Sequence, residues 1–116
     1  EADSGCFAPV GYSVDCADDA QRDRAAAQMQ DILSLLESIG ATRVTTGYSG
    51  ADVTPMRNAG VVLMGHQVDG TRYFDFHHTH ADTMDKVDPE DLSRNVATMA
   101  TVAFVLADMP GRIGAE

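Results

Sequence analysis

The chain has 116 residues, enough for one domain at most, and 44% of them are apolar while 22% are charged. These proportions exclude a wholly disordered chain, and no apolar run approaches the roughly 18–20 residues of a membrane span. The net charge of −10 disfavours nucleic acid and anionic lipid as partners and suits cations, although it also serves solubility alone. No basic segment followed by an apolar one marks a signal peptide.

The region from Asp18 to Ile39 has the spacing of a helix. Its apolar residues recur at intervals of four and three, at Ala25, Met29, Ile32, Leu36 and Ile39. Asp18 or Asp19 is suited to cap its start, and Gly40 stands where a left-handed residue often ends a helix. We therefore expect a helix that turns this stripe toward the core.

A second long helix is predicted from about Pro89 to Asp108. Asp88 is a natural N-cap, and Pro89 fits the first helical turn. The apolar stripe again follows the helical period, at Leu92, Val96, Met99, Ala103 and Leu106. Because nearly every residue from 96 to 107 is apolar or small, we expect this helix to be covered on more than one side.

About four short strands are expected, at Phe7–Val14, Arg43–Thr46, Val61–Met64 and Tyr73–Phe76. The compact apolar run Val61–Met64 is typical of a buried, parallel strand.

A crossover with one short helix fits between the second and third of these strands. The helix is expected at Val53–Asn58, with Asp52 as its cap and Gly60 at its end. The alternation of strands and helices predicts an α/β fold. So few strands make a thin sheet for two apolar helices, and the chain begins with Glu1 rather than Met, so we expect further strands upstream in a longer protein.

The densest group of chemistry-bearing residues lies between Phe76 and Thr83 and includes three of the four histidines. Neutral imidazole is a common metal ligand, and Asp82 could orient one of the rings. The spacing leaves two readings open. One is a metal site, and the other is a polar loop whose histidines bond the backbone while Asp82 caps the next turn.

These residues also resemble a known family. The run His77-His78-Thr79-His80-Ala81-Asp82-Thr83, with the Pro-led helix that ends at Leu106-Ala107-Asp108-Met109, resembles the C-terminal end of two-zinc exopeptidases. The closest branch is the carboxypeptidase Q (plasma glutamate carboxypeptidase) type, related to bacterial zinc aminopeptidases. Glu1-Ala2-Asp3-Ser4-Gly5, Gly50-Ala51-Asp52-Val53 and Asn58-Ala59-Gly60-Val61 are similar to further elements of that branch, in the same order.

The resemblance implies a fold and a metal centre. The fold would be part of a three-layer α/β/α sandwich, and the centre would hold two zinc ions. Asp3 aligns with a ligand of one zinc and His78 with a ligand of the other. In the family a bridging Asp, a second His, a further Glu ligand and the catalytic Glu lie upstream, in His-x-Asp and Glu-Glu motifs that this sequence lacks. A longer parent would hydrolyse small peptides with metal-activated water, and we expect the 116 residues alone not to do so efficiently.

Other residues receive weaker assignments. His77 precedes the aligned ligand, where relatives often place a Tyr that stabilises the reaction intermediate, and it is otherwise a surface or supporting His. Asp82 is expected beside a metal ligand or as a cap rather than as a ligand. Asp52 caps its helix or meets a substrate's ammonium group. His80 receives no role, and Cys6 and Cys16 form one disulfide or remain two thiols.

Two other functions remain open. One is a non-enzymatic packing or interaction domain of the same ancestry, and the other is a small metal-binding module built from the His cluster alone. Expected partners are a small peptide in the parent, a second copy of the chain, or the missing N-terminal part. The resemblance implies a secreted or periplasmic protein, with a cytoplasmic location still possible.

Overall fold

The computed structural model describes residues 1–115 and shows a small α/β domain, which confirms the predicted fold class. The strands are β1 (Pro9–Asp15), β2 (Arg43–Thr46) and β3 (Leu63–Val68). The α-helices are α1 (Asp19–Leu33), α2 (Tyr73–Phe76) and α3 (Pro89–Asp108). Short 3-10 helices lie at η1 (Ser34–Leu36), η2 (Thr54–Ala59) and η3 (Met84–Lys86). No helix among the described residues is long and apolar enough to cross a membrane.

The sheet has the order β2-β1-β3, and β1 is its central strand. β2 runs parallel to β1, whereas β3 runs antiparallel to it. The expectation of a parallel strand at Val61–Met64 is therefore wrong, and the strand begins only at Leu63. An apolar run indicates that a strand is buried, but it does not indicate whether the neighbouring strand runs parallel or antiparallel to it.

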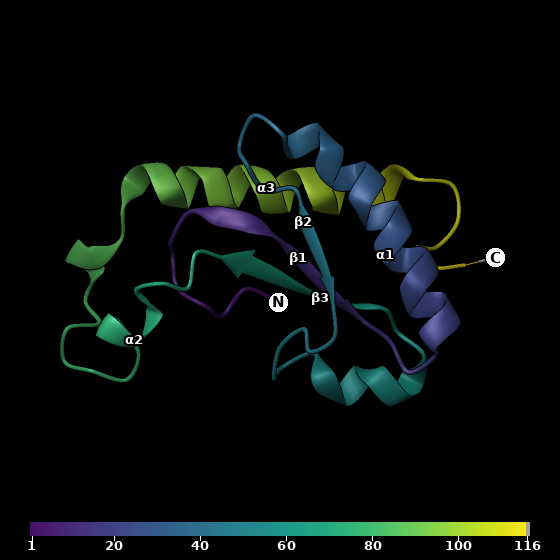
Figure 1. Ribbon diagram of the computed structural model, residues 1–116, viewed down its shortest axis with the longest axis horizontal. Coiled ribbons are helices and arrows are strands. Elements are labelled where there is room, and N and C mark those ends of the chain that lie inside the picture. The colour runs from purple at the N-terminus through teal and green to yellow at the C-terminus, as the bar shows by residue number, and fades with distance from the viewer. Residues whose placement is uncertain (116) are drawn as a thin grey trace.

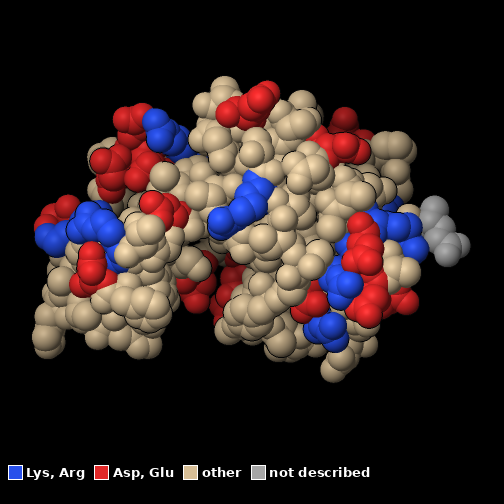
Figure 2. All heavy atoms as spheres, in the orientation of Figure 1, with Lys and Arg blue, Asp and Glu red and all other residues tan. Residues whose placement is uncertain are grey.

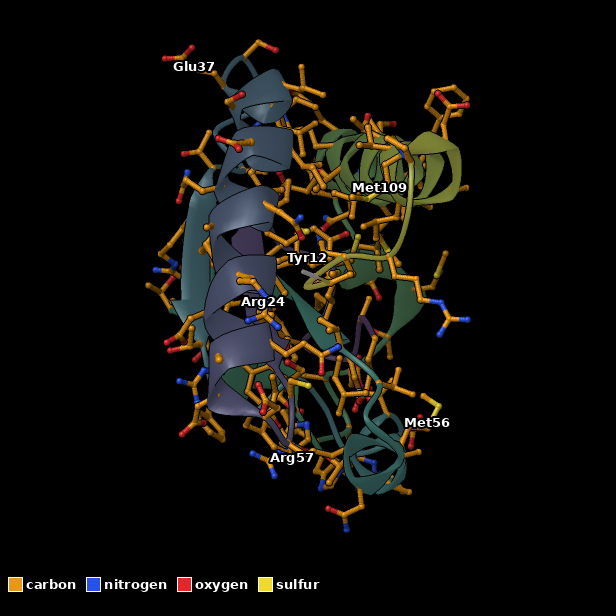
Figure 3. All side chains as sticks on the ribbon, turned by 90° about the vertical axis from the view of Figure 1, so that its right-hand side faces the viewer. Tyr12, Arg24, Glu37, Met56, Arg57 and Met109 are labelled. Atoms are coloured by element: carbon orange, nitrogen blue, oxygen red, sulfur yellow. The ribbon has the colours of Figure 1, made fainter. Side chains whose placement is uncertain are left out.

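Both long helices cover the same face of the sheet. Tyr12 and Val14 point from β1 to that face, and they join Met29 and Leu33 of α1 and Val102 of α3 in one core. Figure 3 shows Tyr12 between α1 and α3, and Figure 1 shows α3 lying along the sheet. The described residues thus form two layers, and the three-layer sandwich that the resemblance implies is not confirmed.

The first long helix follows its sequence signals closely. The Asp18 carboxylate accepts from the backbone N–H of Gln21, which satisfies one of the free donors at the helix start. Four of the five stripe residues are buried, and Ile39 packs against them. The predicted end at Ile39 is wrong, however, because the α-helix ends at Leu33 and the chain continues as η1. Gly40 has the expected left-handed conformation, with a φ of 84°, but it lies beyond η1 rather than at the end of the α-helix.

The second long helix buries a different face from the one predicted. Asp88 caps it as expected, by accepting from the N–H groups of Glu90 and Asp91. Its buried residues are Asn95, Thr98 and Val102, however. Four residues of the predicted stripe are exposed, namely Leu92, Val96, Met99 and Ala103. The stripe has the helical period, but the described part of the chain places the sheet against the neighbouring face.

Tyr73–Phe76 was predicted as a strand and is one turn of helix, α2. A helical turn brings together side chains that are four positions apart, and here Tyr73 stacks on His77, with ring centroids 4.4 Å apart. Arg72 forms an ion pair with Asp75 three positions on, which further favours the turn. The sheet among residues 1–115 therefore has three strands instead of four.

Gly11 controls how closely β1 and β2 approach. It lies at the irregularity of the β1–β3 register and has a φ of 152°. A Cβ at this position would lie 1.8 Å from the backbone oxygen of Arg43. Only glycine lets the two strands pair here.

We expect Gly11→Ala to lower the free energy of unfolding by about 3 kcal/mol, because the methyl group forces the central strand pair apart. Gly70→Ala is the matched control, since a Cβ at Gly70 meets nothing within 4 Å. Urea denaturation followed by circular dichroism measures both variants. Equal stability of the two would contradict this account of the β1–β2 contact.

Candidate functional site

A cleft of about 380 Å³ lies between the N-terminal segment and the segment that follows β3. Its walls include Asp3 and Cys6 on one side and His77, His78 and Asp82 on the other. Figure 2 shows a hollow between the lobe that holds α2 and the rest of the molecule, with acidic side chains visible inside it. Two segments that are distant in the sequence therefore meet at one opening.

The N-terminal segment is held against the outer edge of β3. The backbone N of Glu1 donates to the oxygen of Met64 at 2.8 Å, and the N–H of His66 donates to the oxygen of Glu1 at 2.7 Å. These two bonds flank Gly65, as they do where two parallel strands pair. Asp3 therefore emerges from a fixed point beside the sheet.

The Glu1 side chain adds a second anchor. Its carboxylate accepts from the N–H groups of Asp52 and Val53, at 2.9 and 3.0 Å. These groups lie just before η2, which has no side-chain cap of its own, so the prediction that Asp52 caps this helix is wrong. Glu1, from a distant part of the chain, instead holds the turn that leads into η2. Gly60 ends η2 in the left-handed conformation, as predicted.

Gly50 makes room for that carboxylate. A Cβ at Gly50 would lie 2.2 Å from the Cδ of Glu1. The Glu1 and Gly50 elements, which the resemblance treats as separate motifs, therefore form one interaction.

The histidine segment is folded by its threonines. The Thr79 hydroxyl donates to the oxygen of Phe76 and accepts from the N–H of Ala81. The Thr83 hydroxyl contacts the oxygen of Ala81 and the carboxylate of Asp85. These local bonds give the run between Phe76 and Asp85 a defined shape.

His78 has a φ of 56°, and among the described residues it is the one non-glycine residue with positive φ. This conformation is uncommon for residues other than glycine and often marks functional sites. The ring of His77 stacks between the rings of Tyr73 and His78, with centroid distances of 4.4 and 3.8 Å. The two imidazoles are thus held together on one wall of the cleft.

Negative charge dominates the titratable groups around the cleft. Lys86 also lines it, but its ammonium group pairs with the carboxylate of Asp85. That hydrogen bond, together with one from Thr83, lowers the pKa of Asp85 to about 2. Burial raises the pKa of the Cys6 thiol, and the negative charges of Asp91 and Asp88 raise it further. Cys6 therefore carries its proton at neutral pH, and both cysteines are free thiols rather than a disulfide.

The structure brings some of the predicted site residues together and leaves others apart. Asp3, His77, His78 and Asp82 all line the same cleft. His80 is exposed and is not part of the lining, and neither is Asp52. Within residues 1–115 no group of three or more His, Cys, Asp or Glu side chains is arranged to hold a metal ion.

Sequence reasoning missed three residues that organise this site, namely Glu1, His66 and Asn95. Asn95 receives no assignment from the sequence, yet it is buried and bonds to His66. The one sequence signal was a polar residue directly before the apolar run that begins at Val96. That signal becomes readable only when the buried face of α3 is known.

Carboxylate and imidazole groups gathered in one cleft are the donor types that α/β proteins offer to divalent metal ions. Comparison with known proteins identifies relatives of this chain. Residues of this chain are 38% identical to carboxypeptidase Q of Rattus norvegicus and of Mus musculus, and 35% identical to that of Homo sapiens, each over 109 residues.

Each match covers 94% of this chain and 22% of the relative, so the chain spans about a fifth of the length of these carboxypeptidases. No protein-family model matches the chain, and no solved structure does. The chain is a homologue of one segment of carboxypeptidase Q, which confirms the predicted resemblance. The extent of the matches is consistent with a C-terminal segment.

We expect Gly50→Ala to displace the Glu1 carboxylate and to expose the N–H groups of Asp52 and Val53 to hydrogen exchange. The loss of two hydrogen bonds should make this variant about 1 kcal/mol less stable than Gly47→Ala. Gly47 is the matched control because its φ of 124° is also positive, while a Cβ there meets nothing within 4 Å. Equal exchange at both amides in the two variants would contradict the anchor.

A separate prediction concerns the backbone of His78. We expect His78→Val to be about 1–2 kcal/mol less stable than His78→Gly, because a β-branched residue tolerates positive φ poorly and glycine tolerates it freely. Thermal denaturation of the two variants measures the difference. Identical stabilities would show that this backbone conformation is not imposed by the loop.

Proposed function

We propose that this chain is part of a zinc-dependent exopeptidase that acts on small peptides, and that Asp3 and His78 each bind one of two zinc ions. The observation that supports the proposal is the shared cleft: Asp3 and His78 both line it, although they are 75 positions apart in the sequence. The similarity to carboxypeptidase Q over 94% of the chain supports the same reading.

Asp3 and His78 have side chains of the kinds that bind zinc, but one such ligand for each zinc ion is too few to hold it. Carboxylate oxygen and imidazole nitrogen are regular zinc ligands, and a zinc ion takes four ligands, or three and a water molecule. The described residues offer no group of three. We therefore propose that the remaining donors come from protein outside these 116 residues, and that the 116 residues alone bind zinc weakly and hydrolyse peptides poorly.

The chemistry divides between the metal and the chain. Bound zinc would lower the pKa of a water molecule and polarise the peptide carbonyl. His77, which lines the cleft and stacks with Tyr73 and His78, would donate a hydrogen bond to an oxygen atom of the reaction intermediate. Asp82 would orient a neighbouring ring from the same wall.

Two wider features belong to the same proposal. The two described layers would form part of a three-layer sandwich in the longer protein. A secreted or periplasmic location also rests on the similarity to carboxypeptidase Q alone. Both features concern the longer protein, so neither affects the test that follows.

The test is a chimera in which this chain replaces the matching 109-residue segment of the rat carboxypeptidase Q. We expect the chimera to hold zinc and to cleave a small peptide. Asp3→Ala and His78→Ala should each lower the zinc content and reduce activity by more than about 100-fold, since even residues that merely support a metal ligand are worth 10–100-fold.

His80→Ala is the control for this experiment, because His80 lies outside the cleft lining and should leave both quantities unchanged. Circular dichroism checks that each variant is folded. Full zinc content and activity in the His78→Ala chimera would overturn the proposal.

A further inference from the structure

His66 contributes to the attachment of the Asp3-bearing segment through both its backbone and its side chain. It is 5% exposed and lies in the middle of β3. Its backbone N–H holds the oxygen of Glu1, at the start of the segment. Its imidazole Nε2 lies 2.5 Å from the Oδ1 of Asn95 on α3.

Asn95 carries the connection to the other end of the segment. Its Nδ2 donates to the backbone oxygen of Phe7 at 2.8 Å and to that of Asp91 at 2.7 Å. Carbonyl oxygens only accept, so both amide hydrogens are used and the orientation of the amide is fixed. The opposite orientation would set the Oδ1 of Asn95 against two other oxygens.

This orientation determines the protonation of His66. Since Oδ1 of Asn95 is an acceptor, Nε2 of His66 must carry a proton. The other ring nitrogen, Nδ1, is buried and has no hydrogen-bond partner among the described residues. Burial lowers the pKa of His66, so the ring is neutral at neutral pH, with a bare Nδ1. The imidazole and the Tyr12 ring form an edge-type contact, with ring centroids 5.1 Å apart.

We propose that His66 and Asn95 are positioning residues, which hold Glu1 and Phe7 at fixed points so that Asp3, between them, faces the histidine wall of the cleft. The Nε2–H group of His66 on β3 donates to the Oδ1 of Asn95, and the Nδ2 of Asn95 donates to the carbonyl oxygen of Phe7. Its importance for a metal ion rests on the proposed function, whereas the attachment of the segment does not.

Cys6 offers a direct readout of this attachment. It lies within the held segment, is half-buried, and its Sγ is 4.0 Å from the Nδ2 of Asn95. Cys16, the other free thiol, directly follows β1 and is fully buried. Its labelling rate therefore reports global unfolding of the chain. The ratio of the two labelling rates therefore separates loosening of the segment from loss of stability.

The experiment measures thiol labelling in the complete chain carrying Asn95→Leu, which keeps the number and branching of the side-chain heavy atoms and removes the hydrogen bonds. We expect Cys6 to react about tenfold faster, while Cys16 is unchanged. Rates are taken across a pH series, so that a change in the pKa of Cys6 is distinguished from a change in its exposure.

Thr98→Val is the matched control. Thr98 lies on the same face of α3 and is fully buried, and its hydroxyl has no partner among residues 1–115. This variant should leave both thiol rates as they are. His66→Phe, which keeps a ring beside Tyr12, should also speed the labelling of Cys6, and it serves if Asn95→Leu does not fold.

A spectroscopic measurement completes the test. Nitrogen-15 NMR should show His66 as the Nε2–H tautomer in the unmodified chain and in Thr98→Val, and a mixture of tautomers in Asn95→Leu. Unchanged Cys6 labelling in Asn95→Leu, or the Nδ1–H tautomer in the unmodified chain, would overturn the proposal. Neither readout involves zinc, so failure here is distinct from failure of the chimera.

Discussion

The arrangement of the cleft depends on one backbone interaction, the pair of hydrogen bonds by which Glu1 joins the outer edge of β3. Asp3 is exposed and sits two residues beyond that point, so its position is set by where Glu1 is fixed. The Glu1 carboxylate just before η2 and the Asn95 amide at Phe7 secure the same segment from two further directions. Three elements of the fold thus converge on a stretch that has no regular structure of its own.

The opposite wall is built by different means. Its shape comes from short-range contacts, namely the Thr79 and Thr83 hydroxyls and the stack of Tyr73, His77 and His78. Figure 1 shows the segment that holds α2 at one end of the molecule, below the N-terminal end of α3 and outside the sheet. One wall is therefore positioned by long-range bonds to the sheet, and the other by its own local sequence.

The parts of the fold that sequence predicts well are those decided within a few residues. Asp18 and Asp88 cap their helices because the groups that they satisfy lie two or three positions away. The stripe of α1 is buried because that helix has an apolar face along its length. The prediction at Tyr73–Phe76 failed because four residues fit both the strand and the helix period.

The parts that sequence does not predict are those decided by distant partners. The apolar stripe of α3 is exposed, while the face that carries Asn95 meets the sheet. No pattern along the chain predicts that Asn95 will pair with His66, or that the Glu1 carboxylate will bind the N–H groups of Asp52 and Val53. The resemblance to carboxypeptidase Q singled out Asp3 and His78. It also included Glu1 and Gly50, but it did not indicate that these two residues contact each other and anchor the segment that carries Asp3.

The account stands on Asp3 and His78 serving one dinuclear centre. The most direct measurement is anomalous X-ray diffraction at the zinc absorption edge, from crystals of the carboxypeptidase Q chimera that carries this chain. The account predicts two zinc peaks, one at about 2.0–2.2 Å from a carboxylate oxygen of Asp3 and the other at about 2.0–2.1 Å from an imidazole nitrogen of His78. Two fully occupied zinc ions with Asp3 and His78 both outside coordinating distance would contradict it.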